Sequence, residues 1–191
     1  DEAALGRGAG LVSAMLLAST LATAGLKRGL IRFVPTAGSA SPRLVLKVYA
    51  VALSVSAVYV VAFLLYHRYR SDGLSVLSGG VLPPLLFLAG TLAWGMFVLE
   101  DAVLIGARRA GFVPITNGVF SLAKIGFLLV SASFLAATWG VFASWVVPAG
   151  VVALVVNVWM FRRVLPRLPD HGGPAPHVRE IIRFNGAEYV A

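Results

Sequence analysis

The sequence lacks cysteine altogether and is poor in charge. Without cysteine, the 191-residue chain has no disulfides, thiolate metal sites or cysteine nucleophiles. Asp, Glu, Lys and Arg make up 13% of it, against about 25% in ordinary globular domains. The phosphate-loop, dinucleotide, zinc-protease and nucleophile-elbow patterns GxxxxGK[ST], GxGxxG, HExxH and GxSxG are also missing. We therefore expect no enzymatic activity, no metal ion and no other cofactor.

Apolar residues dominate what is present. They account for 59% of the chain, and the mean hydropathy is +0.87. A single soluble core of this size could not bury so much apolar surface, and the runs lack the alternation of a membrane β-barrel. The predicted class is an all-α integral membrane protein. The net charge of +8 requires no nucleic acid, because membrane proteins collect Lys and Arg on their cytoplasmic side.

Apolar runs predict five transmembrane helices, since a crossing takes roughly 20 residues. The first two are expected at residues 8–26 and 48–66. The third starts at Pro83 and Pro84, crosses by Leu99 and continues through "EDAVLIGARR" as a cytoplasmic extension.

The last two crossings come from one uncharged stretch, residues 125–161. As a single helix this stretch would be roughly 55 Å long, so it must turn back. We place the turn at "TWG", residues 138–140, between helices at 117–137 and 141–161. Residues 1–165 then form a five-helix transmembrane bundle, and residues 166–191 form a cytoplasmic linker and the start of another helix.

Basic residues predict the orientation. They concentrate in the loops after the first, third and fifth helices, which places those loops in the cytoplasm and the first residue outside. The fragment's N-terminus is then outside the cell (cytoplasmic) membrane and its C-terminus is cytoplasmic. A chain that starts outside with neither Met nor a signal peptide is expected to be part of a longer protein, whose remaining helices pack against it.

Lys124 is the most informative charge. It lies about seven residues into the predicted fourth helix, roughly 10 Å deep. Asn117, Ser121, Lys124 and Ser131 share one stripe of that helix. Intramembrane charges usually face a bundle interior or a watery cavity, so this stripe is a candidate contact for an anionic substrate. The alternative is a lysine that snorkels to the membrane surface.

Further candidate site residues lie at the predicted cytoplasmic ends. Arg32, in "GLKRGLIRFVP", is a candidate lining for a cytoplasmic mouth or a contact for lipid phosphate. Glu100 and Asp101 could relay protons, bind a cation or form gating ion pairs with basic neighbours such as Arg108 and Arg109, or they could be solvated. The arginine pair also serves as a topology signal. The first two predicted helices also contain polar side chains, which either line a cavity or form hydrogen bonds between helices. These are Ser13, Thr20, Thr23, Tyr49, Ser56 and Tyr59.

The sign of the charges favours an anionic cargo. The predicted first, second, fourth and fifth helices have no acid in their apolar spans. The groups available inside or at the mouth are the basic side chains of Arg32 and Lys124. A phosphate- or pyrophosphate-linked molecule fits such a lining.

Three segments resemble a known family. "GLKRGLIRFVP", "FVLEDAVLIGARRAGFVPITNGVFSLAKIGFLLV" and "EIIRFNGAEYVA" resemble the polysaccharide-biosynthesis membrane proteins, the Wzx-type oligosaccharide flippases of the MATE-like, or MOP, superfamily. The resemblance covers residues 8–191 and carries no catalytic motif.

This resemblance implies helices two to six of a partial MATE-like N-terminal lobe, with the second lobe absent. It implies flipping of an undecaprenyl-pyrophosphate-linked oligosaccharide across the bilayer by alternating access. Arg32 and Lys124 match recurring basic positions and would hold pyrophosphate or acidic sugars, while Asn117 and Ser121 would support sugar contacts. Two rival interpretations are a MATE-type drug or cation antiporter, which would need intramembrane acids, and a non-transporting membrane scaffold that binds lipid-linked glycan.

Overall fold

The computed structural model describes residues 2–70, 75–169 and 180–181. Within these ranges the chain is helical and has no strand. Six α-helices follow one another along the chain, with short 3₁₀ or π turns between or after some of them. Their bounds are α1 Glu2–Thr23, α2 Leu26–Phe33, α3 Ser41–Arg70, α4 Leu82–Gly106, α5 Phe112–Ser131 and α6 Ala137–Trp159.

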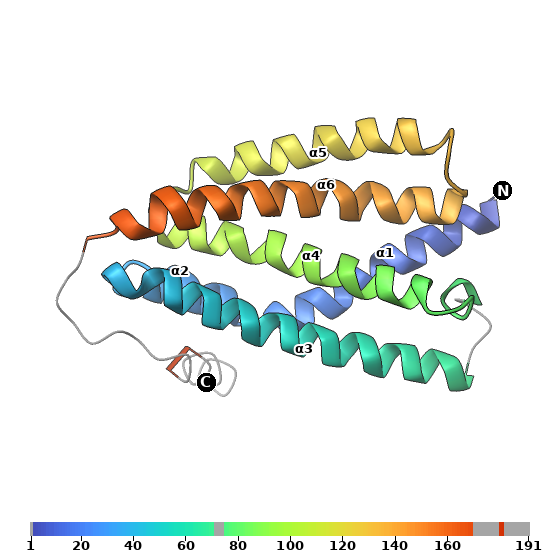
Figure 1. Ribbon diagram of the computed structural model, residues 1–191, viewed down its shortest axis with the longest axis horizontal. Helices are drawn as coiled ribbons and strands as arrows, with labels where there is room; N and C mark the ends of the chain where they lie inside the picture. The colour runs from blue at the N-terminus through green and yellow to red at the C-terminus, as the bar shows by residue number, and fades with distance from the viewer. Residues whose placement is uncertain (1, 71–74, 170–179, 182–191) are drawn as a thin grey trace.

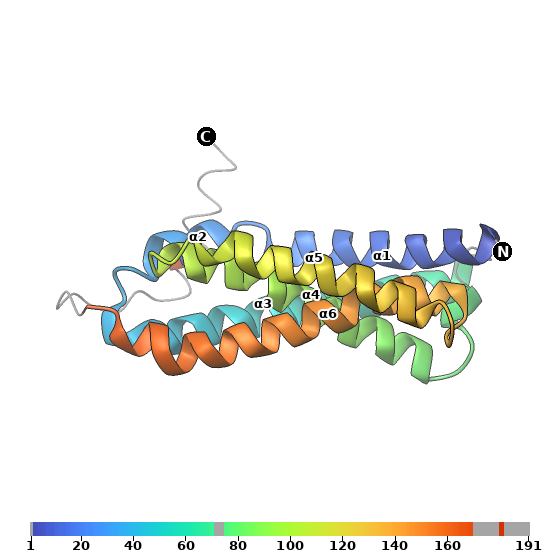
Figure 2. The ribbon, with the colours of Figure 1, turned by 90° about the horizontal axis from the view of Figure 1, so that it is seen from above.

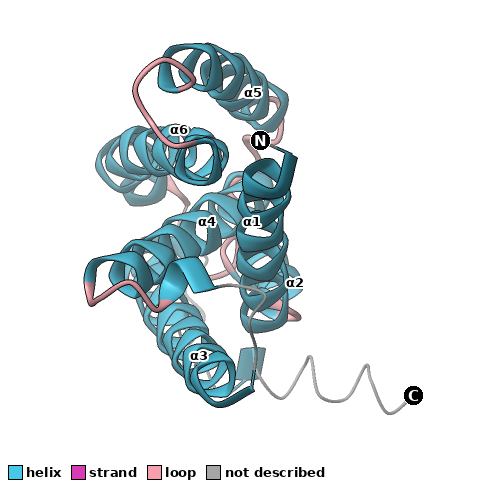
Figure 3. Cartoon of the chain, turned by 90° about the vertical axis from the view of Figure 1, so that its right-hand side faces the viewer, coloured by secondary structure: helices cyan, strands magenta, loops and turns pink. Residues whose placement is uncertain are grey.

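Five of the helices are long and apolar enough to cross a membrane, and α2 is the exception. The predicted all-α membrane class is confirmed to this extent. The five long helices run side by side along the molecule, while α2 lies at one end of the bundle (Figures 1 and 2). Viewed from the end, α4 is surrounded by α1, α3 and α6, and α5 lies on the outer side of α6 (Figure 3).

A glycine separates α1 from α2. Gly25 has a φ of 77°, in the left-handed region where a residue without a Cβ is favoured. The chain then forms a short amphipathic helix, with Leu26 and Leu30 buried and Lys27 exposed. The sequence had indicated a basic segment here but not a separate helix. The positive φ interrupts α1 three residues short of the predicted end at Leu26.

The helices α3 and α4 each differ from their predicted bounds mainly at one end. α3 begins at Ser41, seven residues before the predicted start, and the Ser41 hydroxyl donates to the carbonyls of Val34 and Gly38. α4 begins as predicted, with prolines in its first turn. Its predicted extension through the arginine pair is wrong, because α4 ends at Gly106 and Arg108 has a φ of 57°, which an α-helix cannot contain.

The turn between α5 and α6 also lies at a different place in the sequence from the predicted one. The predicted turn at residues 138–140 is wrong, because the chain reverses at 132–136, after Ser131 and before Ala137. The amide of Leu135 donates to the carbonyl of Ser131 within this reversal. The Thr138 hydroxyl donates to the carbonyl of Ala4 in α1, 2.9 Å away, and this bond ties the first turn of α6 to α1. α5 accordingly starts five residues earlier than predicted.

α6 continues without a break into a π turn, Met160–Val164, and a 3₁₀ turn, Leu165–Arg167. The helical path therefore runs past the predicted end at Phe161. Most of the predicted linker and following helix, residues 166–191, lies outside the described residues. Within it, Ile181 is fully buried and packs on the α2 side of the bundle.

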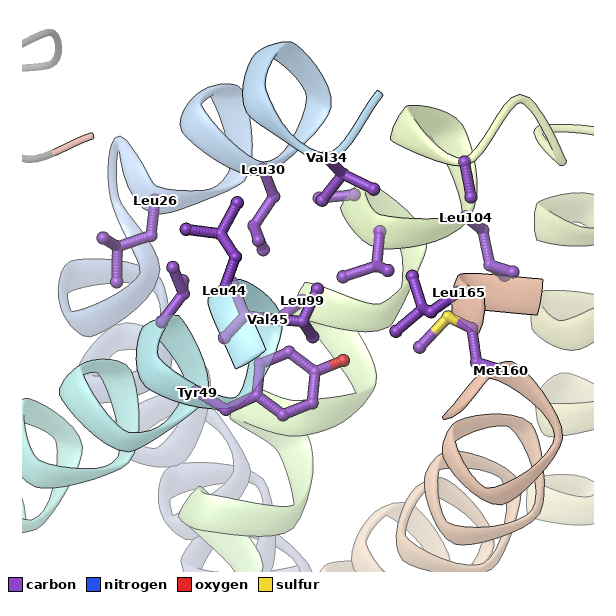
Figure 4. Packing of buried hydrophobic residues seen from close by; sticks show 14 of the residues in the cluster. Leu26, Leu30, Val34, Leu44, Val45, Tyr49, Leu99, Leu104, Met160 and Leu165 are labelled. Atoms are coloured by element: carbon purple, nitrogen blue, oxygen red, sulfur yellow. The ribbon is translucent and has the colours of Figure 1, made fainter. Parts of the chain in front are cut away.

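The interior consists of three apolar clusters. One lies where α2, α3, α4 and the end of α6 meet, and includes Leu30, Tyr49, Leu99 and Met160 (Figure 4). The second lies towards the other end of the bundle, around Met15 and Phe87. The third lies between α4, α5 and α6 around Phe97 and Phe120.

Glycines allow neighbouring helices to approach each other closely. A Cβ on Gly8 would lie 2.8 Å from the Thr138 carbonyl oxygen, and one on Gly106 would lie 2.9 Å from the Leu30 carbonyl oxygen. Small residues at such crossings are typical of packed membrane helices.

Candidate functional site

A buried carboxylate occupies the interior of the bundle. Glu100 is fully buried, and it lies six residues before the end of α4, roughly 9 Å along the helix axis. It faces inward because Phe97, Val103 and Leu104, which lie three or four positions away, are buried on the same side of α4. The alternative that Glu100 is a solvated carboxylate is wrong, because its side chain is fully buried.

Asn157 of α6 is the hydrogen-bond partner of Glu100. Its Nδ2 donates to Glu100 Oε2 over 3.2 Å and to the carbonyl of Ala153 over 2.8 Å. Both hydrogens of the amide are thereby used. Glu100 Oε1 and Asn157 Oδ1 are buried and have no partner within the described part of the chain.

Tyr49 of α3 completes this group. Its side chain is 4% exposed and it neighbours both Asn157 and Glu100. Its hydroxyl points from α3 towards the side where Met160 lies, at the start of the π turn that follows α6 (Figure 4). That hydroxyl is a third buried polar atom without a partner among the described residues. We call Glu100, Asn157 and Tyr49 the Glu100 triad.

Asp101 forms a second polar contact on a different face of α4. Consecutive helix residues point about 100° apart, so Asp101 faces α5. There, Asn117 Nδ2 donates to both of its carboxylate oxygens, at 3.3 and 3.2 Å, and to the Val113 carbonyl. Although the Lys27 side chain of α2 is exposed, partial desolvation by the surrounding protein lowers the pKa of its amine, and the nearby Asp101 carboxylate opposes that shift. Asp101 thus joins α4 to α5 through hydrogen bonds, and its charge acts on Lys27 of α2.

Lys124 is deeper than the sequence indicated. α5 begins at Phe112, so Lys124 comes twelve residues along it, roughly 18 Å from that end. Its ammonium lies 4.1 Å from the centre of the Trp145 ring in α6 and 5.7 Å from that of Phe120. The lysine is partly exposed and aromatic rings support it, which is a cation–π arrangement.

Four rings form the base of this arrangement. Trp94 lies 5.3 Å from Phe97, 5.5 Å from Phe120 and 5.4 Å from Trp145 between ring centres. The rings come from α4, α5 and α6, and we call them, with Lys124, the lysine–aromatic cluster. Phe97 and Phe120 are buried, whereas Trp94, Trp145 and Lys124 are partly exposed. The cluster thus holds one cation over aromatic rings at mid-helix depth, where the ammonium can bind an anionic group.

The remaining predicted site residues are exposed. Ser121 is exposed and donates to the Asn117 carbonyl one turn back in α5. Arg32 is exposed in α2, with its guanidinium 5.7 Å from the Phe33 ring centre. Arg108 and Arg109 are exposed in the turn after α4. Among the described residues, no ion pair joins the arginine pair to Glu100 or Asp101.

The sequence did not indicate Asn157 or Trp145 as site residues, and it indicated Tyr49 only as a polar side chain within an apolar helix. One signal could have found Asn157, because it is the only carboxamide in the uncharged stretch of residues 125–161. Its pairing with Glu100 could not be read from the chain, because 57 positions separate them.

Among the described residues, no group of three or more His, Cys, Asp or Glu is placed to hold a metal ion. Comparisons with protein-family models, curated proteins and solved structures found no match.

Proposed function

We propose that the chain is part of a membrane transporter that moves a lipid-linked oligosaccharide, of the undecaprenyl-pyrophosphate type, across the cytoplasmic membrane. The observation that carries the proposal is the position of Lys124. A cation held at mid-helix depth over aromatic rings is costly in a membrane and suits a cargo with an anionic linker and sugar rings.

The charge at one end of the bundle supports this proposal. α2, the turn after α4 and the end of α6 lie at the same end (Figure 1), and their basic residues are exposed there. These are Lys27, Arg28, Arg32, Arg108, Arg109, Arg162, Arg163 and Arg167. If this end faces the cytoplasm, as the distribution of Lys and Arg indicates, it would meet pyrophosphate-linked cargo on the side where such molecules are made.

The experiment is a transport assay on the complete gene product, in a host whose own flippase has been deleted. Lys124→Ala and Lys124→Glu should lower surface glycan at normal membrane expression, and Lys124→Arg should retain more of it. Thr116→Ala is the control on the same helix, because the Thr116 hydroxyl donates to the Val113 carbonyl within α5. Equal surface glycan in wild type and all three Lys124 variants would defeat the proposal.

The buried Glu100 favours a second candidate, a MATE-type drug or cation antiporter. Such a transporter needs an acid inside its helices, and α4 provides one that is fully buried. The discriminating measurement is efflux of a fluorescent organic cation from the same host. Efflux that is abolished by Glu100→Gln, together with surface glycan that does not depend on Lys124, would favour the antiporter over the flippase.

A further inference from the structure

The Glu100 triad contains more hydrogen-bond acceptors than donors. If Glu100 is ionised, Glu100 Oε1 and Asn157 Oδ1 can only accept, and Asn157 Nδ2 is already committed to Glu100 Oε2 and Ala153. The Tyr49 hydroxyl brings one hydrogen. That single hydrogen can satisfy one of the two acceptors, so the other would stay buried and unpaired.

The charge of an ionised Glu100 is not balanced either. The charge that acts on it comes from Asp101 and has the same sign. Lys27 acts on Asp101 from α2, α3 contributes Tyr49, and α6 contributes the uncharged Asn157. The described charged residues of α1, Glu2 and Arg7, lie near its first turns, towards the opposite end of the bundle. A fully buried carboxylate next to a like charge is strongly disfavoured.

One added hydrogen resolves both problems. A neutral Glu100 would donate from Oε1 to Asn157 Oδ1 while its Oε2 continues to accept from Nδ2. Carboxyl and amide would then form a closed, reciprocal pair that joins α4 to α6, and the Tyr49 hydroxyl could donate to a second lone pair of the same oxygens.

We propose that Glu100 is a proton-binding site, in which an exchangeable proton on its carboxyl group is shared with Asn157 Oδ1 and closes the α4–α6 contact. Release of the proton leaves a carboxylate facing an amide oxygen and opens that contact. The inference does not rest on the transport proposal, since it concerns the triad and not Lys124.

The test is infrared difference spectroscopy of the protein in lipid nanodiscs between mildly acidic and alkaline buffer. A carboxylic acid C=O band should be present at mildly acidic pH, disappear at alkaline pH and be missing in Glu100→Gln. Asp101→Asn is the matched control on the adjacent residue and should keep the band. Loss of the band in Asp101→Asn but not in Glu100→Gln, or the absence of any titrating band in wild type, would overturn the proposal.

Two further measurements keep the test decisive. Thermal unfolding of wild type should show a lower Tm at alkaline pH, while Glu100→Gln, whose amide can donate to Asn157 Oδ1 at every pH, should show a flatter profile. If Glu100→Gln does not fold, the pair of wild type and Asp101→Asn still gives the infrared answer. Exchange of potassium for sodium at constant pH should leave the band unchanged, and its loss on addition of sodium would assign the site to a metal ion instead.

Discussion

The Asn157 amide of α6 donates to the Glu100 carboxylate of α4 over 3.2 Å, although 57 positions separate the two residues. Both side chains are more than nine-tenths buried, at 7% and 0% exposed. The contact therefore joins two long helices at a depth where water cannot replace a lost partner. It makes Asn157 as important to the interior as the acid itself.

Replacement of Asn157 by leucine should destabilise the protein. The change keeps the volume similar but leaves Glu100 Oε2 without its donor, and an unsatisfied buried acceptor costs about 1–3 kcal/mol. The measurement is the free energy of unfolding in mixed micelles. Ser144→Ala is the control, because the Ser144 hydroxyl donates only within α6. A smaller loss for Asn157→Leu than for Ser144→Ala would contradict the assigned role.

Two glycines of α1 should respond in opposite ways to alanine. A Cβ at Gly8 would lie 2.8 Å from the Thr138 carbonyl and 2.9 Å from the Val141 Cβ, whereas nothing lies within 4 Å of one at Gly6. We expect Gly8→Ala to cost about 1–3 kcal/mol through overpacking. Gly6→Ala should be neutral or stabilise by up to about 1 kcal/mol, since alanine is the better helix former. Thermal unfolding of the two variants side by side is the measurement, and equal Tm values would show that α1 and α6 are not packed in this way.

Lys124 and Trp145 should be energetically coupled. The ammonium lies 4.1 Å from the ring centre, and such a contact contributes about 0.5–2 kcal/mol. A double-mutant cycle with Lys124→Met and Trp145→Leu isolates this term from the loss of packing. Lys124→Arg should keep most of the coupling. A coupling energy near zero would mean that the ammonium lies elsewhere.

The absence of cysteine makes the orientation directly measurable. Arg108 lies in the turn after α4 and Ser133 in the turn after α5, at opposite ends of the bundle, and both are exposed. In intact cells, a membrane-impermeant maleimide should label Ser133→Cys and not Arg108→Cys, if the basic end is cytoplasmic. The parent without the introduced cysteine gives the background. The reverse labelling pattern would invert the assigned topology.

The five long apolar helices were predictable from sequence because their number depends on length and hydropathy alone, whereas the short helix α2 was not predicted. The ends of the helices were less predictable, because they depend on local backbone conformations that composition does not determine. The positive φ of Arg108 ends α4 early, and the reversal at residues 132–136 contains no glycine or proline to mark it.

The candidate site was also predictable only in part: spacing within one helix could be predicted, but contacts between helices could not. The stripe of Asn117, Ser121 and Lys124 follows from helical spacing within one helix, and all three lie in α5. The partners of these residues come from other helices. Asp101 accepts from Asn117, and Trp145 lies beside Lys124. Glu100 and Asp101 are neighbours in sequence, yet they face different partners because a helix turns about 100° between them.

The hydrogen bond from Thr138 to Ala4 spans 134 positions, and this separation constrains the order of assembly. During synthesis α1 enters the membrane long before its partner exists. The face of α1 that carries Gly8 therefore cannot pack against α6 until α6 has been synthesised. The segment between these two residues contains α2, α3, α4 and α5. The contact between α1 and α6 can therefore form only after these four helices and the start of α6 have been made.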